Sequence, residues 1–193
     1  MASPPDDFRN LLLAEFRPYA ELSAKHLEQL EEHYNLLVRW NQHLNLTRIE
    51  SILDSVRFHY CESLYLGLKL PAGPLQVADV GSGAGFPGIP IAILRPDLSV
   101  TLIESHKRKA VFLREAIRHL GNTHVLSARA EERPERFDWV VSRAVAPSEV
   151  LSAGLAPNCA LLVAAKDASA GSEILRSPWG DGRVLAFHVE RSP

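Results

Sequence analysis

Over the first 70 residues, apolar side chains recur at spacings of three and four, which is the pattern of amphipathic helices. Ser23 is a suitable N-cap for one helix, and a later helix is expected over residues 51–67, before Pro71. The buried faces are predicted to hold Leu27, Leu30, Tyr34, Leu37 and Val38 in the first helix and Ile52, Val56, Leu64 and Leu68 in the second. The pattern therefore predicts an all-helical segment over residues 6–70.

From residue 75 onward, short β-rich runs alternate with helical patterns, such as a helix over residues 107–120 that ends at Gly121. The runs lie at residues 75–80, 100–103, 124–127, 139–142, 160–166 and 184–189. This alternation is typical of βαβ units, so the fold class is predicted to be α/β, with a mainly parallel, Rossmann-like central sheet and an N-terminal helical extension. The stretch 168–175 is too short for a full crossover helix, so the last strands are expected to be reduced.

The extension is predicted to cover residues 1–70 and the sheet domain residues 71–193, with the joint at 70–74. A chain of 193 residues is one ordinary domain with a modest extension, and no stretch approaches the ~18 consecutive apolar residues of a membrane helix. The start of the chain does not read as a secretion signal, so we expect a cytoplasmic protein without a membrane partner.

The net charge of −2 argues against a long track for naked nucleic acid, but the charge is unevenly distributed. Residues 105–143 hold nine Lys and Arg against five Asp and Glu. On charge alone, a solvated helix face is the simpler interpretation of this basic segment. Cys61 and Cys159 are far apart and in no metal spacing, so they are expected to be small core residues, and no metal is expected.

The most informative motif is the glycine turn Gly81-Ser-Gly83-Ala-Gly85, which follows the predicted strand that ends at Asp79 and Val80. Glycines at such a turn bring bare backbone N–H groups close to a ligand. The next predicted strand ends at Glu104, at the distance where Rossmann-like folds place a carboxylate for ribose hydroxyls. Turn and carboxylate together indicate a nucleotide-type cofactor.

The glycine spacing distinguishes between two cofactor classes. A dinucleotide loop has the spacing G-x-G-x-x-G, whereas this chain has G-x-G-x-G preceded by Asp79. A carboxylate there would repel a pyrophosphate but suits a ligand with an amino group and a sulfonium, such as S-adenosylmethionine. A nicotinamide-dependent oxidoreductase is therefore the less favoured interpretation.

In a doubly wound sheet, ligands bind at the carboxyl ends of the strands. These ends are predicted to bring together Asp79 to Phe86, Glu104, Ala130, Glu131, Ser142, Arg143, Ala144, Lys166 and Asp167. Arg143 is the candidate for a contact with the methionine carboxylate or a base edge, with a surface ion pair as its structural alternative. Arg143 and Lys166 are the two residues predicted to act in the transfer itself.

Methyl transfer from a sulfonium is an in-line displacement, so alignment of the reactants at roughly 3–3.5 Å supplies most of the acceleration. A ring nitrogen such as guanine N7 presents a free lone pair and requires no base. The chain lacks the Asn/Asp-Pro-Pro-Tyr tetrapeptide with which amino-directed enzymes hold an exocyclic NH₂, and has Ser142-Arg-Ala-Val-Ala-Pro147 in its place.

Four ordered segments between about residues 36 and 166 resemble the RsmG (GidB) family of bacterial ribosomal RNA methyltransferases. They are Trp40-Asn-Gln-His-Leu-Asn-Leu-Thr47, Asp79-Val-Gly-Ser-Gly-Ala-Gly-Phe-Pro-Gly88, Arg129-Ala-Glu131 and Phe137-Asp-Trp-Val-Val-Ser-Arg-Ala144. The resemblance implies an S-adenosylmethionine-dependent methyltransferase that modifies N7 of a guanosine in 16S rRNA. It implies the small ribosomal subunit as partner, and we expect a monomer.

Carried over by position, the resemblance implies which residues hold the cofactor. Gly81 and Phe86 would line it, Glu104 would hold the ribose, Ala130 and Glu131 would flank the adenine, and Arg143 would complete the site; Asp79, Gly83 and Gly85 complete the predicted cofactor set. It also implies that Asn41, Asn45 and His59 lie near the substrate entrance, whereas Trp40 is expected to be a core anchor. For Asn41 and Asn45, a buried hydrogen-bonding role remains the alternative to RNA contact.

The target guanine is expected to stack near Phe86 and Pro87, with phosphates meeting residues 105–143 and Lys166. Two positions depart from the family pattern: Glu62 stands where an aspartate is usual, and Asp167 stands where a glycine is usual. Two other classes stay open from the residues alone. They are a methyltransferase for a small molecule or protein, and a non-catalytic binding module on the same fold.

Overall fold

A computed structural model describes residues 4–48, 51–130, 136–168, 172–180 and 182–189. Its helical segments are α1 (Pro4–Phe16), α2 (Ala24–Asn41), α3 (Ile52–Asp54), the π-helix η1 (Ser55–Cys61), α4 (Glu62–Lys69), α5 (Gly88–Leu94), α6 (Lys107–Ala116), α7 (Pro147–Ser152) and the 3₁₀ turn η3 (Ala165–Asp167). Its strands are β1 (Gln76–Val80), β2 (Ser99–Ile103), β3 (Thr123–Leu126), β4 (Trp139–Arg143), β5 (Asn158–Ala164), β6 (Glu173–Arg176) and β7 (Arg183–His188). The glutamate Glu131 lies outside the described residues.

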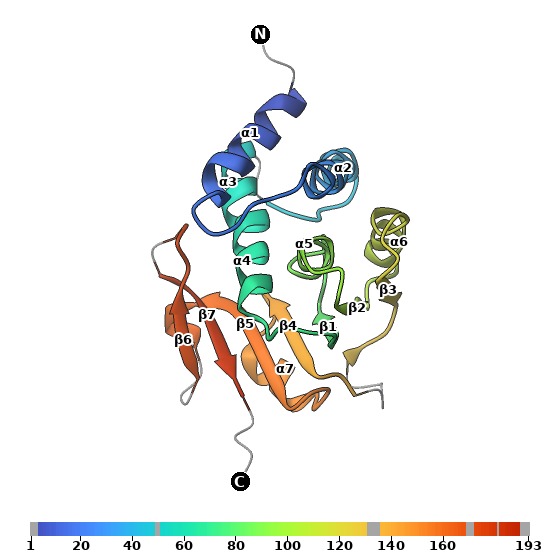
Figure 1. The fold of residues 1–193 in the computed structure, drawn as a ribbon. Helices are drawn as coiled ribbons and strands as arrows, with labels where there is room; N and C mark the ends of the chain where they lie inside the picture. Colours follow the sequence, from blue (N-terminus) through green and yellow to red (C-terminus); the bar gives the residue numbers. More distant parts are fainter. Residues whose placement is uncertain (1–3, 49–50, 131–135, 169–171, 181, 190–193) are drawn as a thin grey trace.

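The strands form one sheet in the order β3-β2-β1-β4-β5-β7-β6 (Figure 1). β1 to β5 are mutually parallel, and β7 runs antiparallel between β5 and β6. The predicted α/β class with a mainly parallel sheet is therefore confirmed. The order reverses between β1 and β4, which makes their carboxyl ends the place where a doubly wound sheet opens a crevice.

The link from β5 to β6 contains no crossover helix among its described residues, only the turn η3. This confirms the expectation that the last part of the sheet is reduced. The alternating pattern missed β6, because this four-residue edge strand leaves Ile174 52% exposed and buries little on either face. The predicted strand over 160–166 instead covers Asn158–Ala164, so Lys166 lies just beyond its end.

The N-terminal helical extension is confirmed, and Ser23 caps α2 as predicted. The Ser23 hydroxyl accepts from the N–H of His26, and the His26 ring accepts from the N–H of Ser23. Leu30 and Leu37 are buried, but the prediction for Val38 is wrong, because its side chain is 46% exposed. It lies one position past Leu37, at the edge of the apolar face.

The helix predicted over residues 51–67 is present, but its middle is a π-helix. The helix predicted over 107–120 ends earlier as a regular α-helix, at Ala116, and continues as turns. Periodicity locates such elements well, whereas their ends depend on local hydrogen bonds that the pattern does not contain.

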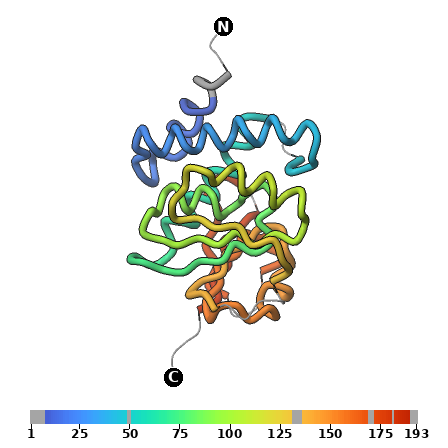
Figure 2. Tube along the Cα trace, turned by 90° about the vertical axis from the view of Figure 1, so that its right-hand side faces the viewer, coloured from blue at the N-terminus to red at the C-terminus, as the bar shows by residue number. Residues whose placement is uncertain are grey.

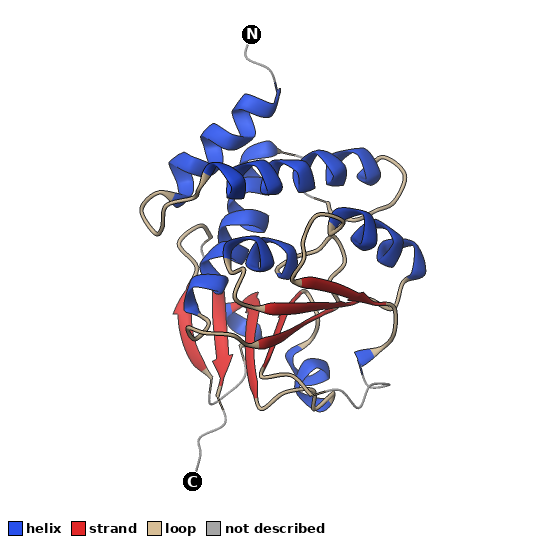
Figure 3. Cartoon of the chain, turned by 45° about the vertical axis from the view of Figure 1, so that its right-hand side comes forward, coloured by secondary structure: helices blue, strands red, loops and turns tan. Residues whose placement is uncertain are grey.

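The helices cover the two faces of the sheet unequally (Figure 3). One hydrophobic cluster unites α1, α2, η1, α4 and α5 with one face of the sheet, and a smaller cluster beneath the other face includes Val150 of α7. Figure 2 shows α2 as an outer layer over α5 and α6. The helical extension and the sheet therefore share one core.

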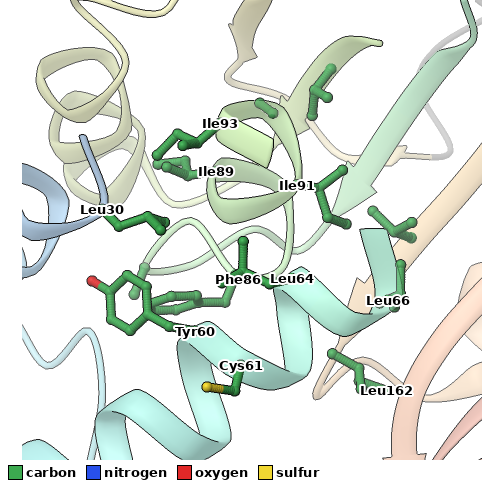
Figure 4. Close-up of a cluster of buried hydrophobic side chains, with 14 of the residues drawn as sticks. Leu30, Tyr60, Cys61, Leu64, Leu66, Phe86, Ile89, Ile91, Ile93 and Leu162 are labelled. Carbon is green, nitrogen blue, oxygen red and sulfur yellow. The ribbon is translucent and has the colours of Figure 1, made fainter. Parts of the chain in front are cut away.

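Several anchors tie these layers together. Trp40 packs edge-on against Phe112 of α6 and donates its indole N–H to Glu115, which supports the core-anchor interpretation. Tyr60 and Phe86 lie together under Leu30 in the cluster shown in Figure 4. The thiols of Cys61 and Cys159 are free and buried, as expected for core cysteines.

A buried ion pair connects the helical extension to the last strands. Glu62 is fully buried, and its two oxygens accept from Nε and Nη2 of Arg183 at 2.6 and 2.7 Å. A third bond comes from the Ser177 hydroxyl at 2.9 Å. Glutamate at this position therefore reaches β7 with a bidentate pair, which holds the reduced end of the sheet against α4.

We predict that Arg183→Met lowers the free energy of unfolding by about 3 kcal/mol, because it leaves the Glu62 carboxylate buried without its ionic partner. This lies at the low end for a buried pair because the Arg183 side chain is 32% exposed. The double variant Glu62→Leu/Arg183→Met should recover most of the loss, as measured by urea unfolding.

Arg57→Met is the matched control. Arg57 also forms an ion pair, with Glu15, but both of these side chains are partly exposed. That loss should stay below about 1 kcal/mol. Equal losses for Arg183→Met and Arg57→Met would contradict the assignment of Glu62 and Arg183 as the pair that holds the last strands.

Candidate functional site

The register of the sheet brings the predicted site residues to one edge. Val80 is level with Ile103 on β2 and with Ser142 on β4. Gly81, Glu104 and Arg143 follow or end these strands, so they meet at the carboxyl edge where the strand order reverses. The structure thus places these three residues at the predicted edge, whereas ligand binding there stays a prediction.

Two cavities open at this edge. The first, here called the β1–β2 cavity, has a volume of about 320 Å³ and is lined by Val80, Gly81, Ile103, Glu104, Ser105, Ala128, Arg129, Ala130, Val145 and Glu149. Gly81, Glu104 and Ala130, three of the predicted cofactor residues, thus share one cavity. Its wall combines the carboxylates of Glu104 and Glu149 and the guanidinium of Arg129 with small and apolar groups, so it offers acceptors for ribose hydroxyls beside an apolar surface for a flat base.

The second, here called the β4–β5 cavity, has a volume of about 550 Å³ and is lined by Arg143, Ala144, Val145, Ala146, Pro147, Leu162, Val163, Ala164, Asp167 and Arg183. Val145 lines both cavities, so they adjoin at its side chain. Gly81 packs closely against Val145: a Cβ atom at residue 81 would meet Cγ2 of Val145 at 2.5 Å. With φ at +72°, Gly81 also adopts a conformation that favours glycine.

The backbone N–H groups of the glycine turn are not bare, which corrects the sequence-based expectation. Those of Gly81 and Ser82 donate to Ile103 O, and that of Gly83 donates to Glu104 Oε2 at 2.9 Å. That of Gly85 donates to Ser82 O. The turn is closed on itself and on β2, so these groups are not available to cradle a pyrophosphate, and the geometry disfavours a dinucleotide.

Glu104 organises this edge. Its carboxylate is 7% exposed and accepts from Gly83 N–H and, at 2.7 Å, from His106 N–H at the start of α6. A carboxylate oxygen has more than one lone pair, so these bonds leave it capacity to accept from ribose hydroxyls. The role of Glu104 toward a ribose stays a prediction that its place in the β1–β2 cavity supports.

Asp79 lies beneath the turn and is not among the residues that line either cavity. It is fully buried, Oδ2 accepts from Gly88 N–H at 3.0 Å, and Oδ1 has no hydrogen-bond partner. Burial is the main cause that raises the pKa of Asp79 to about 7, and the nearby Glu104 adds to it. A contact between Asp79 and a cofactor therefore stays a prediction, while its hold on the start of α5 is direct.

The Phe86 side chain faces the helical extension. It stacks on His59 with ring centroids 4.5 Å apart and meets the ring of Tyr60 edge-on at 5.1 Å. At 5% exposure, with one face covered by His59, the ring offers no free face for a guanine. The expected stacking of the target base on Phe86 is thus not supported, and any contact of residue 86 with a cofactor falls to its backbone.

Arg143 lies at the end of β4 and donates to Phe58 O of η1. Burial and the neighbouring Arg183 lower the pKa of Arg143 to about 10, so it remains a cation at neutral pH. The next residue, Ala144, has φ at +63°, in the left-handed region that alanine rarely adopts. The chain thus turns sharply where it leaves β4, and Arg143 lines the β4–β5 cavity.

Lys166 and Asp167 follow β5 in η3. Lys166 is exposed and is not among the lining residues, whereas Asp167 lines the β4–β5 cavity. The carboxylate that departs from the family pattern therefore stands in the crevice. A direct role for Lys166 in transfer stays a prediction.

The asparagines of the helical extension differ. Asn41 accepts from the N–H groups of Leu46 and Thr47 and donates to Thr47 O, so its side chain holds the loop that follows α2 in a hydrogen-bonding role. Asn45 is exposed. His59 bonds Thr47 Oγ1 through Nε2 at 2.7 Å and is 7% exposed. These contacts favour the structural alternative for Asn41.

Sequence reasoning missed two residues that contact the site. His33, in α2, bonds the carbonyl of Ala84 in the glycine turn, and Arg183 of β7 lines the β4–β5 cavity. The signal for His33 was available: it lies between Leu30 and Leu37 on the predicted apolar face, where a histidine needs a polar partner. No sequence pattern pointed to Arg183. It begins β7, and only the antiparallel pairing of β7 with β5 brings it level with Ala164 at the end of β5.

The sheet order, the antiparallel β7 and the two adjoining cavities define the Rossmann-like fold of S-adenosylmethionine-dependent methyltransferases. A solved S-adenosylmethionine-dependent methyltransferase from Aquifex aeolicus matches with a TM-score of 0.53 and 18% identity, covering 70% of this chain and 93% of that one. The two proteins share the fold.

The family follows from the sequence comparisons. The model of the family described as rRNA small subunit methyltransferase G matches residues 26–176, and the chain belongs to that family. Ribosomal RNA small subunit methyltransferase G of Halorhodospira halophila is 44% identical over 180 residues, 90% of this chain and 84% of the relative. The protein of the same name from Desulforamulus reducens is 43% identical over 142 residues, 68% of this chain but only 59% of the relative. The predicted family, fold class and cofactor class are confirmed.

We predict that Asp79→Asn changes how stability depends on pH. The unfolded carboxyl loses its proton near pH 3.8, whereas the folded one keeps it until about pH 7. Between these values the folded state binds more protons, so the wild-type protein loses stability as pH rises. Asparagine keeps the acceptor for Gly88 N–H but carries no charge, so its stability relative to wild type should rise from pH 4.5 to 7.5 by about 3 kcal/mol.

Urea unfolding at four pH values measures this difference, with Asp97→Asn as control. Arg95 holds the pKa of the Asp97 carboxyl below its usual range, so both states of that residue are ionised throughout and its difference from wild type should stay flat. A flat difference for Asp79→Asn as well would contradict the burial of an uncompensated carboxyl there.

Proposed function

We propose that this protein transfers a methyl group from S-adenosylmethionine to N7 of a guanosine in 16S rRNA of the small ribosomal subunit. The observation that carries the proposal is the pair of cavities that adjoin at Val145, within a chain of the rRNA small subunit methyltransferase G family. The β1–β2 cavity suits an adenosine, and the β4–β5 cavity would give a substrate access to the end of the cofactor.

The residues of the β1–β2 cavity fit the cofactor. Glu104 would accept from the ribose hydroxyls, while Ile103 and Ala130 would pack on the adenine. Arg143 would receive the methionine carboxylate from the neighbouring cavity, as a permanent cation. When bound, S-adenosylmethionine supplies an electrophilic methyl group on a positively charged sulfur.

The protein's task is then one of positioning. Guanine N7 carries a lone pair and needs no proton removed, so the enzyme needs only to hold the base in line with the methyl group. The β4–β5 cavity would take a base that is extruded or already unpaired, and enzymes that act on bases commonly require this. With Arg143 on the methionine carboxylate, the Arg183 guanidinium on its wall would hold an acceptor atom of the base or its phosphate.

The start of α6 supports an RNA substrate. Lys107, Arg108 and Lys109 occupy the first helical turn, where the positive end of the helix dipole disfavours cations. Glu104 and Ser105, just before them, line the β1–β2 cavity, and Arg129 lines it from the other side. Cations placed against the dipole beside a cavity are explained by contact with phosphates, which outweighs the local cost.

A methyltransferase for a small molecule or a protein would use the same cofactor residues. The basic turn of α6 favours the rRNA substrate over that class. Its cations oppose the helix dipole and so reduce stability, and a substrate without phosphates would not offset this cost. The folded subunit would supply the rest of the recognition surface, which reconciles a net charge of −2 with an RNA substrate. We further propose that the protein acts as a monomer in the cytoplasm, where the subunits are.

Purified protein with labelled S-adenosylmethionine should methylate RNA of small subunits prepared from cells that lack the enzyme, and mass mapping should locate the label at a guanine N7. Naked 16S rRNA, large subunits, and panels of metabolites and proteins serve as rival substrates. Arg143→Ala should lose transfer to the subunit, while the exposed Arg114→Ala on the same basic segment should keep it. Label that enters only the metabolite or protein panel would overturn the proposal.

We also predict that Lys107→Glu/Arg108→Glu raises the KM for the RNA substrate at least tenfold while it stabilises the fold. Reversal of the two charges removes phosphate contacts but agrees with the helix dipole, which contributes about 0.3–1 kcal/mol per charge. The measurements are KM at two salt concentrations and the midpoint of urea unfolding. An unchanged KM would show that this turn does not contact RNA.

A further inference from the structure

We infer that His33 is a positioning residue for the cofactor: its hydrogen bond to Ala84 holds the glycine turn in its binding geometry and ties cofactor affinity to the N-terminal helical extension. The inference rests on the proposed function only in that S-adenosylmethionine is the ligand of the β1–β2 cavity. It concerns a residue of α2, remote in sequence from the turn that it contacts.

Both ring nitrogens of His33 are engaged, and the partners define their roles. Nε2 lies 3.0 Å from Ala84 O, and a carbonyl only accepts, so Nε2 carries the proton. Nδ1 lies 3.0 Å from the Tyr60 hydroxyl and accepts from it. The chain of bonds therefore runs from Tyr60 of η1 through His33 of α2 to the turn, with all three residues buried.

Glu104 holds the same turn from the other side. It accepts from Gly83 N–H, next to Ala84, while Gly83 and Gly85 on either side have φ values of +54° and +88°. Glycine is the residue with the most backbone freedom, so a turn of this composition needs fixed points to keep one shape. The Glu104 and His33 bonds are two such points, one from the sheet and one from the helical extension.

The imidazole also packs directly on the turn. A Cβ atom at Gly85 would lie 3.2 Å from His33 Nε2, and the ring meets Phe86 edge-on with centroids 5.2 Å apart. A leucine would fill much of this apolar space without the cost of burying a polar ring. The hydrogen bond to Ala84 is therefore what histidine adds, and what it adds acts on the turn.

The neutral ring keeps this arrangement at physiological pH. Burial lowers the pKa of His33 to about 4, so the tautomer with its proton on Nε2 persists across the range in which the enzyme works. The bond to Ala84 is thus a constant feature of the fold.

The test compares three variants of α2. His33→Leu removes the bond to Ala84 and keeps the bulk, and His33→Gln places an amide N–H near the position of Nε2. Leu37→Ala is the matched control, because Leu37 is buried one turn further along the same helix and contributes packing alone. Dissociation constants for S-adenosylmethionine and S-adenosylhomocysteine are measured calorimetrically at a temperature where circular dichroism shows each variant folded.

We expect His33→Leu to weaken binding of both ligands about tenfold, because a turn released from Ala84 spends most of its time outside the binding geometry and the apparent Kd rises in proportion. His33→Gln should recover most of the affinity, and Leu37→Ala should stay within about twofold of wild type although it is less stable. If His33→Leu does not fold, His33→Asn, whose shorter side chain does not reach Ala84, takes its place. Unchanged affinity in the variant that lacks the bond, or equal losses in Leu37→Ala, would overturn the inference, whereas a wild-type protein that binds neither ligand would instead overturn the proposed function.

Discussion

The hydrogen bonds between the glycine turn and the end of β2 determine the shape of the whole crevice. Ile103 O accepts from the first two N–H groups of the turn, and Glu104 accepts from the third. With these groups engaged, the turn is fixed to the end of β2, and Gly81, Ile103 and Glu104 together line the β1–β2 cavity. Fold and cofactor preference thus have one cause: the closed turn leaves few free N–H groups for a phosphate, while Gly81 and the Glu104 carboxylate stay at the cavity wall, which suits an adenosine better.

The N-terminal helical extension also holds residues of the crevice in place. It contributes His33 to the turn and Phe58 O to Arg143, so helices that precede the sheet in sequence contact both the glycine turn and a residue of the β4–β5 cavity. The pairing of Glu62 with Arg183 extends this support to the last strands. The extension and the sheet therefore work as one unit around the crevice, and no helix among the described residues is long and apolar enough to cross a bilayer.

Much of this architecture was predictable, because it follows from periodicity and from the edge at which parallel strands end. The helical extension, the parallel core of the sheet and the meeting of Gly81, Glu104 and Arg143 at one edge are of this kind. β6 was not predictable, because it is an exposed edge strand and its residues show no alternation of buried and exposed positions. The π-helical geometry of η1 was missed because seven residues are too few for an apolar pattern to distinguish i→i+5 hydrogen bonding from that of a regular helix.

The site was less predictable in its details. Motif position placed Phe86 and Asp79 beside a ligand, but the side-chain directions depend on packing partners that lie far away in sequence. Phe86 turns toward His59, and Asp79 turns toward Gly88, because the helical extension and α5 occupy the space there. Contacts of this kind, like that between His33 and Ala84, become visible only when the tertiary packing is known.

The backbone of Ala144 has a consequence for how the crevice receives its ligands. An L-residue in the left-handed region costs roughly 1–2 kcal/mol relative to its ordinary conformations, and glycine would avoid most of that cost. Glycine would also let the segment sample many other shapes. With alanine, the walls carrying Arg143 and Val145 have few alternatives, so an arriving molecule finds them already in place and forfeits less entropy on docking.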